Sequence, residues 1–192
     1  ALVNTTNNRT QFTLETTDRL FYENEVDVTY RAKFKEEDFS IASSYKLDTF
    51  SAGFGIGYRL NKDLIHTVDL DYIIKDYKVT DSSTVASSIG NSSGENISFV
   101  LKNKLFYNTL NSLMIPQNGR LLSFTNLIET PTSSSNGFLK NIVTFKNFKK
   151  FNKNIVSFQA NVGNIITLSN NDILTDDKFS LGGRWLRGFD TF

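Results

Sequence analysis

Residues 25–35 read EVDVTYRAKFK, and apolar and charged side chains alternate along the whole stretch. The apolar positions are every second residue, from Val26 to Phe34, and the residues between them are charged or polar. Successive side chains of a β-strand point to opposite faces, so a period of two predicts a strand with one apolar and one charged face.

The same alternation recurs along the chain. It is clear in FSAGFGIGYR (50–59) and in TVDLDYII (67–74), where Ile73 interrupts it. The sequence predicts about eight strands and no convincing helix, with the strands near residues 10–18, 25–35, 50–59, 67–74, 97–108, 119–130, 138–149 and 154–168. The expected fold class is all-β and antiparallel.

The lengths of the strands and connections favour a membrane barrel. Soluble strands centre near about 5–6 residues, tilted membrane strands need about 9–11, and the predicted strands have the longer lengths. Fairly short connections alternate with longer, more polar ones: 19–24, 60–63, 109–118 and 150–153 against 36–43, 80–96, 131–137 and the residues after 168. Outer-membrane barrels have short turns on one rim and long loops on the other. The pattern therefore predicts an up-and-down transmembrane β-barrel in which 80–96 is an extracellular loop.

A soluble β-sandwich or a small ligand-binding barrel is the alternative. Their strands also alternate, and their apolar face lines an inner core instead of meeting lipid. Alternation by itself does not say which face points inward, so both architectures stay open at this point.

The composition excludes several classes of protein. Only 39% of the 192 residues are hydrophobic, and no apolar run approaches the roughly 18 residues of a spanning helix. The chain has no Cys and one His, His66, so it offers neither a disulfide framework nor the clustered ligands of an ordinary catalytic metal site. We expect no metal site and no cofactor.

Clusters of charge have simple interpretations. The acidic run 36–38 lacks the ligand spacing of a calcium loop and is expected to be solvated. Asp69 and Asp71 share a strand face and are expected to line a wet lumen. The lysines at 146–153 are typical of a solvated turn, and with 21 basic against 20 acidic residues the chain predicts no nucleic-acid partner.

Two motifs carry a family resemblance. Residues 179–189 read FSLGGRWLRGF, and 115–119 read IPQNG just before a predicted strand. In these blocks the sequence resembles the BamA-type outer-membrane assembly factors, which have F-x-x-G-G-x-x-[VL]-R-G-F and, upstream, an F-P-x-x-G turn. Ile115 replaces the usual Phe, and Leu186 stands where Val is frequent.

The resemblance implies that residues 1–192 are one partial domain, the middle strands of a barrel of roughly sixteen strands. The periplasmic POTRA domains and the closing strands would lie outside these residues. The implied function is non-enzymatic folding and insertion of β-barrel proteins in the outer membrane of a Gram-negative cell. The implied partners are nascent outer-membrane β-barrel proteins, accessory lipoproteins and membrane lipid. A TamA-type or two-partner-secretion transporter, or a passive porin, is the alternative.

The resemblance also indicates site residues. It places a loop motif in the barrel lumen, where Arg187 would pair with a carboxylate of the wall and Phe189 would pack against it. Pro116 and Gly119 would form a tight structural turn before the strand that follows. The predicted lumen motif consists of Gly182, Gly183, Leu186, Arg187, Gly188 and Phe189.

Overall fold

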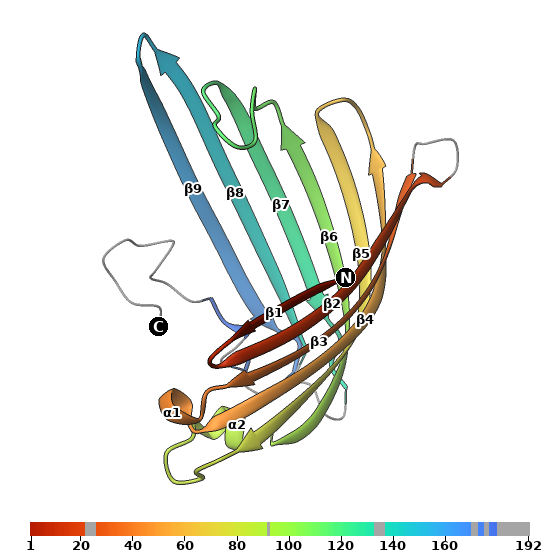
Figure 1. The fold of residues 1–192 in the computed structure, drawn as a ribbon, viewed down its shortest axis with the longest axis vertical. Coiled ribbons are helices and arrows are strands. Elements are labelled where there is room, and N and C mark those ends of the chain that lie inside the picture. Colours follow the sequence, from red (N-terminus) through yellow and green to blue (C-terminus); the bar gives the residue numbers. More distant parts are fainter. Residues whose placement is uncertain (22–25, 92, 133–136, 170–172, 175–176, 180–192) are drawn as a thin grey trace.

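A computed structural model describes residues 1–21, 26–91, 93–132, 137–169, 173–174 and 177–179. These residues form a single nine-stranded antiparallel sheet in which each strand pairs with the next one along the chain (Figure 1). The strands are β1 (Leu2–Thr6), β2 (Arg9–Phe21), β3 (Val26–Asp38), β4 (Tyr45–Arg59), β5 (Leu64–Val79), β6 (Gly94–Asn108), β7 (Gly119–Glu129), β8 (Phe138–Phe151) and β9 (Asn154–Thr167).

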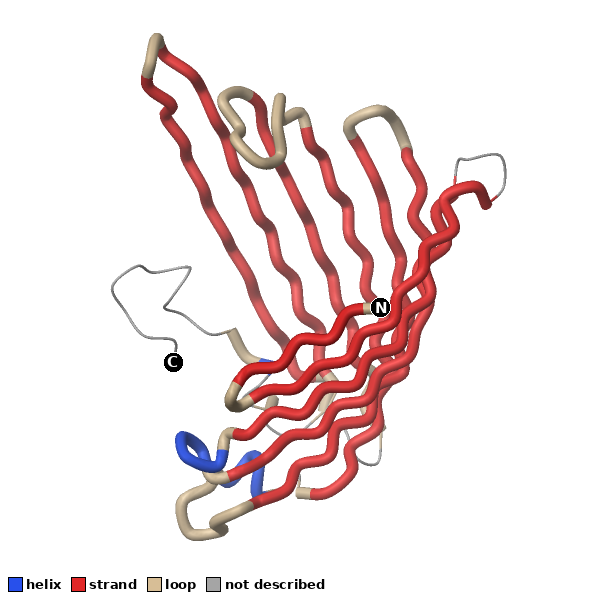
Figure 2. The backbone as a smooth tube through the Cα atoms, in the orientation of Figure 1, coloured by secondary structure: helices blue, strands red, loops and turns tan. Residues whose placement is uncertain are grey.

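The sheet curls strongly. In Figures 1 and 2 the first three strands cross in front of the last four, so the sheet has a concave and a convex side. The predicted all-β, up-and-down barrel architecture is confirmed. The β-sandwich alternative is wrong, since the described strands all belong to one sheet, whereas a sandwich packs two.

The structure has nine strands where the sequence predicted about eight. The additional one is β1, which pairs with β2 from Leu2 opposite Thr13 to Thr6 opposite Arg9. Only Asn7 and Asn8 connect the two strands. The sequence LVNTT carries too few apolar residues for a period of two to be detected.

The two faces of the sheet differ in chemistry. Charged and polar residues on the concave face, called the inner face below, are largely covered; as whole residues, Ser98, Glu129 and Asp69 are 4%, 6% and 9% exposed. Apolar side chains of the convex, outer face are far more open, as at Tyr30 (56%) and Phe99 (47%). A soluble sheet protein buries its apolar face. This inverted arrangement is that of a membrane barrel with a polar lumen.

The connections lie on two opposite rims. At one rim β2 ends and β3 begins, and likewise β4 and β5, β6 and β7, and β8 and β9. At the other rim β1 ends and β2 begins, and likewise β3 and β4, β5 and β6, and β7 and β8. The predicted alternation of fairly short with longer connections is not kept throughout, because 109–118 is longer than 39–44 and 7–8 is a two-residue turn. We call the second rim the long-loop rim after its longest connection, 80–93.

Two short helices, α1 (Ser40–Ser43) and α2 (Ser87–Gly90), lie at the long-loop rim, where the sequence predicted none (Figure 1). The predicted loop 80–96 is shorter than expected, since Gly94 already begins β6. Neither helix in the described residues is long or apolar enough to cross a membrane.

Candidate functional site

An ion-pair cluster lies on the inner face of the first strands. Arg31 of β3 reaches across β4 to two carboxylates of β5. Its Nη1 lies 2.7 Å from Asp69 Oδ1, and its Nη2 lies 3.0 Å and 3.1 Å from the two carboxylate oxygens of Asp71. The side chains are partly covered, at 26% exposure for Arg31 and 12% for Asp69. A guanidinium held by two carboxylates fixes the spacing of three neighbouring strands.

Glycines of β4 make room for this cluster. Gly53 lies opposite Arg31 and Asp71, and Gly55 lies opposite Asp69. A Cβ at Gly53 would collide with the Asp71 carboxylate, and a Cβ at Gly55 would collide with the Asp69 carboxylate. The alternating glycines of 50–59 therefore leave a lane in which the arginine crosses the strand.

A short segment after β9 returns to the inner face and is held there by two lysines. Lys75 of β5 donates from Nζ to both carboxylate oxygens of Asp177, at 2.8 Å and 2.9 Å. Lys140 of β8 donates from Nζ to the Asp177 carbonyl oxygen at 2.7 Å. β5 and β8 are separated by two strands of the sheet. The segment at Asp177 is thus tied to the inner face at two distant strands.

Phe179 lies on the same wall. The Lys140 Nζ sits 4.5 Å from the centroid of the Phe179 ring, a cation–π contact. The ring lies over Gly163 of β9, where an added Cβ would be 2.6 Å from Phe179 Cζ. Phe179 is the first residue of the block FSLGGRWLRGF, so the chain enters this block from a fixed position on the inner face.

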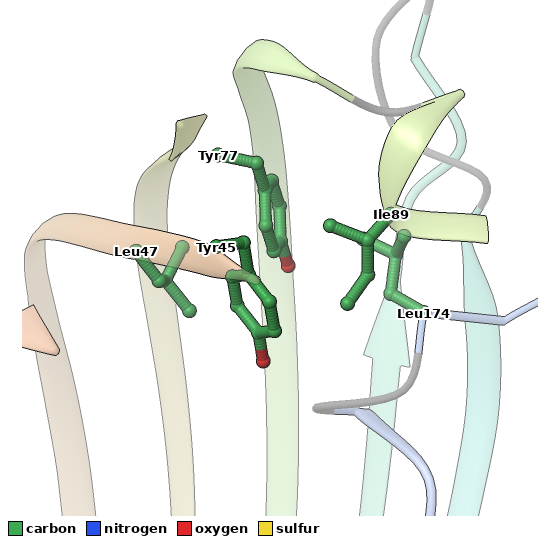
Figure 3. Packing of buried hydrophobic residues seen from close by; sticks show 5 residues of the cluster. All are labelled: Tyr45, Leu47, Tyr77, Ile89 and Leu174. Carbon is green, nitrogen blue, oxygen red and sulfur yellow. The ribbon is translucent and has the colours of Figure 1, made fainter. Parts of the chain in front are cut away.

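An apolar cluster closes the inner face near the long-loop rim. Figure 3 shows Ile89 of α2 and Leu174 of the returning segment facing Tyr77 and Tyr45. The five residues of the cluster are 1% to 7% exposed: Tyr45, Leu47, Tyr77, Ile89 and Leu174. The connection 80–93 therefore folds inward onto the sheet, and the returning segment packs on it.

The connection 80–93 also contains a carboxylate with a shifted pKa. Asp81 Oδ1 accepts hydrogen bonds from the Ser83 hydroxyl at 2.6 Å and the Ser83 backbone N–H at 2.9 Å. These bonds stabilise the charged form and lower the pKa of Asp81 below its ordinary value.

The predicted turn residues lie in the connection 109–118 and at its end. Gly119 has a φ of +111°, and a Cβ there would collide with the Thr109 carbonyl oxygen. Asn111 organises the rest, since its Oδ1 accepts from the backbone N–H groups of Gln117 and Asn118, each at 3.0 Å. Pro116 lies inside the loop closed by these bonds.

The predicted lumen motif lies outside the described residues: Gly182, Gly183, Leu186, Arg187, Gly188 and Phe189. Its placement stays a prediction. Sequence reasoning placed Asp69 and Asp71 in a wet lumen but missed Arg31 as their partner. It also missed Lys75, Lys140 and Asp177, because no local pattern links Asp177 to lysines 102 and 37 positions away.

The arrangement supports holding a chain segment against the inner face. No group of three or more His, Asp or Glu residues that could hold a metal occurs within the described ranges. What the inner face provides is a polar wall with charged and aromatic contacts for a polypeptide.

Comparisons with known proteins agree with this architecture. The model of the Omp85 superfamily domain matches residues 1–192. No curated protein matches the sequence. Among solved structures, the fold is similar to the crystal structure of BamA from Haemophilus ducreyi lacking POTRA domains 1–3, with a TM-score of 0.79 and 17% identity. The match covers 92% of this chain and 37% of that one, so the chain spans well under half of that protein.

Proposed function

The chain belongs to the Omp85 superfamily, and from this premise we propose that it forms the central wall of a barrel that folds and inserts other β-barrel proteins into the outer membrane. The process would be non-enzymatic and would need no cofactor. The nascent barrel protein would be the client, accessory lipoproteins would assist, and the outer membrane of a Gram-negative cell would be the location.

The observation that carries this proposal is the returning segment. Asp177 and Phe179 are held on the inner face by Lys75 and Lys140. The FSLGGRWLRGF block follows directly in the sequence. An assembly barrel would use a segment anchored across two distant strands to brace its wall during insertion of a client, and this use fits the family to which the chain belongs.

We propose that Arg187 completes this anchor. Its planar guanidinium would pair with a carboxylate of the wall, and Gly182, Gly183 and Gly188 would allow the close backbone approach. Leu186 and Phe189 would add apolar contacts. Pro116 and Gly119 are assigned a structural role, the shaping of the connection before β7.

Client insertion would use strand pairing. An incoming strand can add to an open sheet edge through its backbone hydrogen bonds, whatever its side chains. In this proposal the residues described here supply the rigid part of the barrel, and the pairing edge lies elsewhere in the full-length protein.

The test is replacement of the matching span in an essential BamA by residues 1–192. We expect the hybrid to restore growth when BamA is depleted. A hybrid that is folded and present at the normal level but does not restore growth would contradict the insertase assignment. Secretion of a passenger protein by that hybrid would instead favour the transporter branch of the superfamily.

A second arm tests the motif itself. Arg187→Ala in the full-length protein should reduce assembly and alter heat-modifiable migration. The matched control is Arg184→Ala, which removes an arginine from the same block at a variable motif position. Equal behaviour of the two variants would argue against a special role for Arg187. Large, constant conductance that does not depend on Arg187 would identify a porin.

A further inference from the structure

Four asparagines form a row across the outer face of β6, β7, β8 and β9. The strand register places Asn103 opposite Asn126, Asn126 opposite Asn141, and Asn141 opposite Asn164. One asparagine therefore comes from each of four successive strands, and no strand in the row is skipped. We call these four residues the asparagine row.

Apolar residues frame the row on both sides. Side chains two positions away along each strand point to the same face, and all eight of these neighbours are large and apolar. On one side they are Leu101, Ile128, Leu139 and Ile166, and on the other Leu105, Phe124, Val143 and Val162. The exposed fractions of Phe124 (40%) and Ile166 (50%) show that this face is open to the surroundings. In an outer-membrane β-barrel those surroundings are lipid.

The hydrogen-bonding capacity of the row exceeds what the row can satisfy. Asn126 Nδ2 donates to Asn141 Oδ1 at 2.7 Å, which is the ladder bond expected between neighbouring carboxamides. Each carboxamide has two N–H donors, and a row of four can use at most one donor for each neighbouring pair. More than half of the donors therefore need an acceptor from outside the row. An unpaired amide in an apolar environment is unfavourable.

We propose that the asparagine row is a lipid-binding site that takes the acceptor oxygens of a membrane lipid, its ester carbonyl and phosphate groups. These oxygens accept hydrogen bonds and donate none, so they match the excess of N–H donors. The lipid surrounds the outer face in excess over any protein. The inference rests on the outer face of the barrel being in lipid and is independent of the insertase assignment.

The position of the row fits a lipid head group. Asn126, Asn141 and Asn164 each lie three residues inside a strand end at the long-loop rim, at Glu129, Phe138 and Thr167. That is about 10 Å along a strand, and less in depth because barrel strands are tilted. The head-group layer of a bilayer is roughly 5–8 Å thick. A lipid whose head group lies a few ångströms deeper in the membrane beside β6–β9 would bring its ester and phosphate oxygens to the asparagine row.

The test compares two asparagines of the same strand and face. Full-length protein is purified in mild detergent, mixed with palmitoyl-oleoyl phosphatidylethanolamine, and analysed by native mass spectrometry. Asn141→Leu should lower the occupancy of bound lipid by about fivefold or more, the loss of roughly 1 kcal/mol or more of binding. Asn147→Leu, on the outer face of β8 but outside the row, should leave it unchanged. A lipid with ether-linked chains has the phosphate group but no ester carbonyl, so it separates the two acceptors. Binding of this lipid would identify the phosphate as the acceptor, and loss of binding would identify the ester carbonyl.

Three results would overturn the proposal: equal lipid occupancy in Asn141→Leu and the unmodified protein, equal loss in both leucine variants, or a second polypeptide in place of lipid on the row. A measurement without leucine variants guards against misfolding. A fluorophore on Val143→Cys should be quenched more by a head-group nitroxide lipid than one on Phe50→Cys. Both positions face outward, five residues from the long-loop ends of β8 and β4. Equal quenching would contradict the proposal.

Discussion

Arg31 binds Asp71 across an intervening strand, with Arg31 Nη2 3.0 Å from Asp71 Oδ1. β4 passes between the two residues, and the position of β4 that lies opposite both is Gly53. The inner face thus contains a charge pair that only a glycine could allow. This relationship ties the composition of 50–59 to the rigidity of the wall.

Removal of the arginine should loosen this wall. Arg31→Ala leaves two partly covered carboxylates without their partner, and we expect the free energy of unfolding to fall by about 1–3 kcal/mol. Lys33→Ala is the control, since Lys33 shares the strand and face and has no ion pair among the described residues. Urea unfolding of the full-length protein in micelles measures both. Equal effects would contradict a special contribution of the cluster.

The glycines of β4 predict different effects on stability for two substitutions by alanine. Gly55→Ala should displace the Asp69 carboxylate and destabilise the fold, because the added Cβ overlaps that group. Gly57→Ala should be nearly neutral, since its Cβ would meet Thr67 Cγ2 at an ordinary 3.4 Å. Thermal loss of heat-modifiable migration would report the difference. A similar midpoint temperature for both variants would contradict the need for glycine beside the Asp69 carboxylate.

The tie between Lys75 and Asp177 predicts a covalent link. A carbodiimide should activate the Asp177 carboxylate and let the Lys75 amine displace the urea by-product, forming an amide bond, because Lys75 Nζ lies 2.8 Å from Asp177 Oδ1. Mass spectrometry of the digested full-length protein would detect the cross-linked peptides. Lys102, on the inner face of β6, should link to Asp177 less. Preferential linking through Lys102 would show that the segment lies elsewhere.

The missing side chain at Gly163 makes room for the Phe179 ring. Gly163→Val should push the ring away from Lys140 and increase cleavage near Phe179 by chymotrypsin, with little change in overall stability because the ring lies at the edge of the wall. Asn161→Val is the comparison on the same face of β9. Unchanged cleavage in Gly163→Val would contradict the contact.

Asp81 predicts a pH effect in the connection 80–93. Its lowered pKa means that the hydrogen bonds with Ser83 are fully present above the ordinary pKa of aspartate and are lost as the pH falls through the lower, folded value. Ser83→Ala should raise the pKa of Asp81 toward the ordinary value. Titration of the labelled Asp81 carboxyl by NMR measures this, and an unchanged pKa would refute the assignment.

Much of the fold could be predicted from the sequence. The period of two between Val26 and Phe34 predicted strands, and the polar connections separated them in the correct order. The prediction missed β1, whose five residues are too few for a periodic signal. It also missed α1 and α2, because four-residue helices depend on contacts such as that of Ile89 with Tyr77 and not on local propensity.

The candidate site was less accessible to sequence reasoning. The block around Arg187 indicates a lumen loop by resemblance, and its placement remains a prediction. The ion pair of Asp177 and Lys75 joins residues 102 positions apart. The spacing of residues in the sequence cannot indicate such a pair. The asparagine row likewise depends on four strand registers, each of which moves a side chain to the other face if it slips by one residue.

The amino-acid sequence alone determined that this protein is a set of long antiparallel strands with one apolar and one charged face. It did not determine which face is enclosed, because the period of two is the same for a soluble sandwich and a membrane barrel. The curl of the sheet answers that question by covering Asp69 and Ser98 while leaving Tyr30 and Phe99 open. Curvature arises from the twist and pairing of all nine strands together, so it is a property of the folded chain and of no single segment.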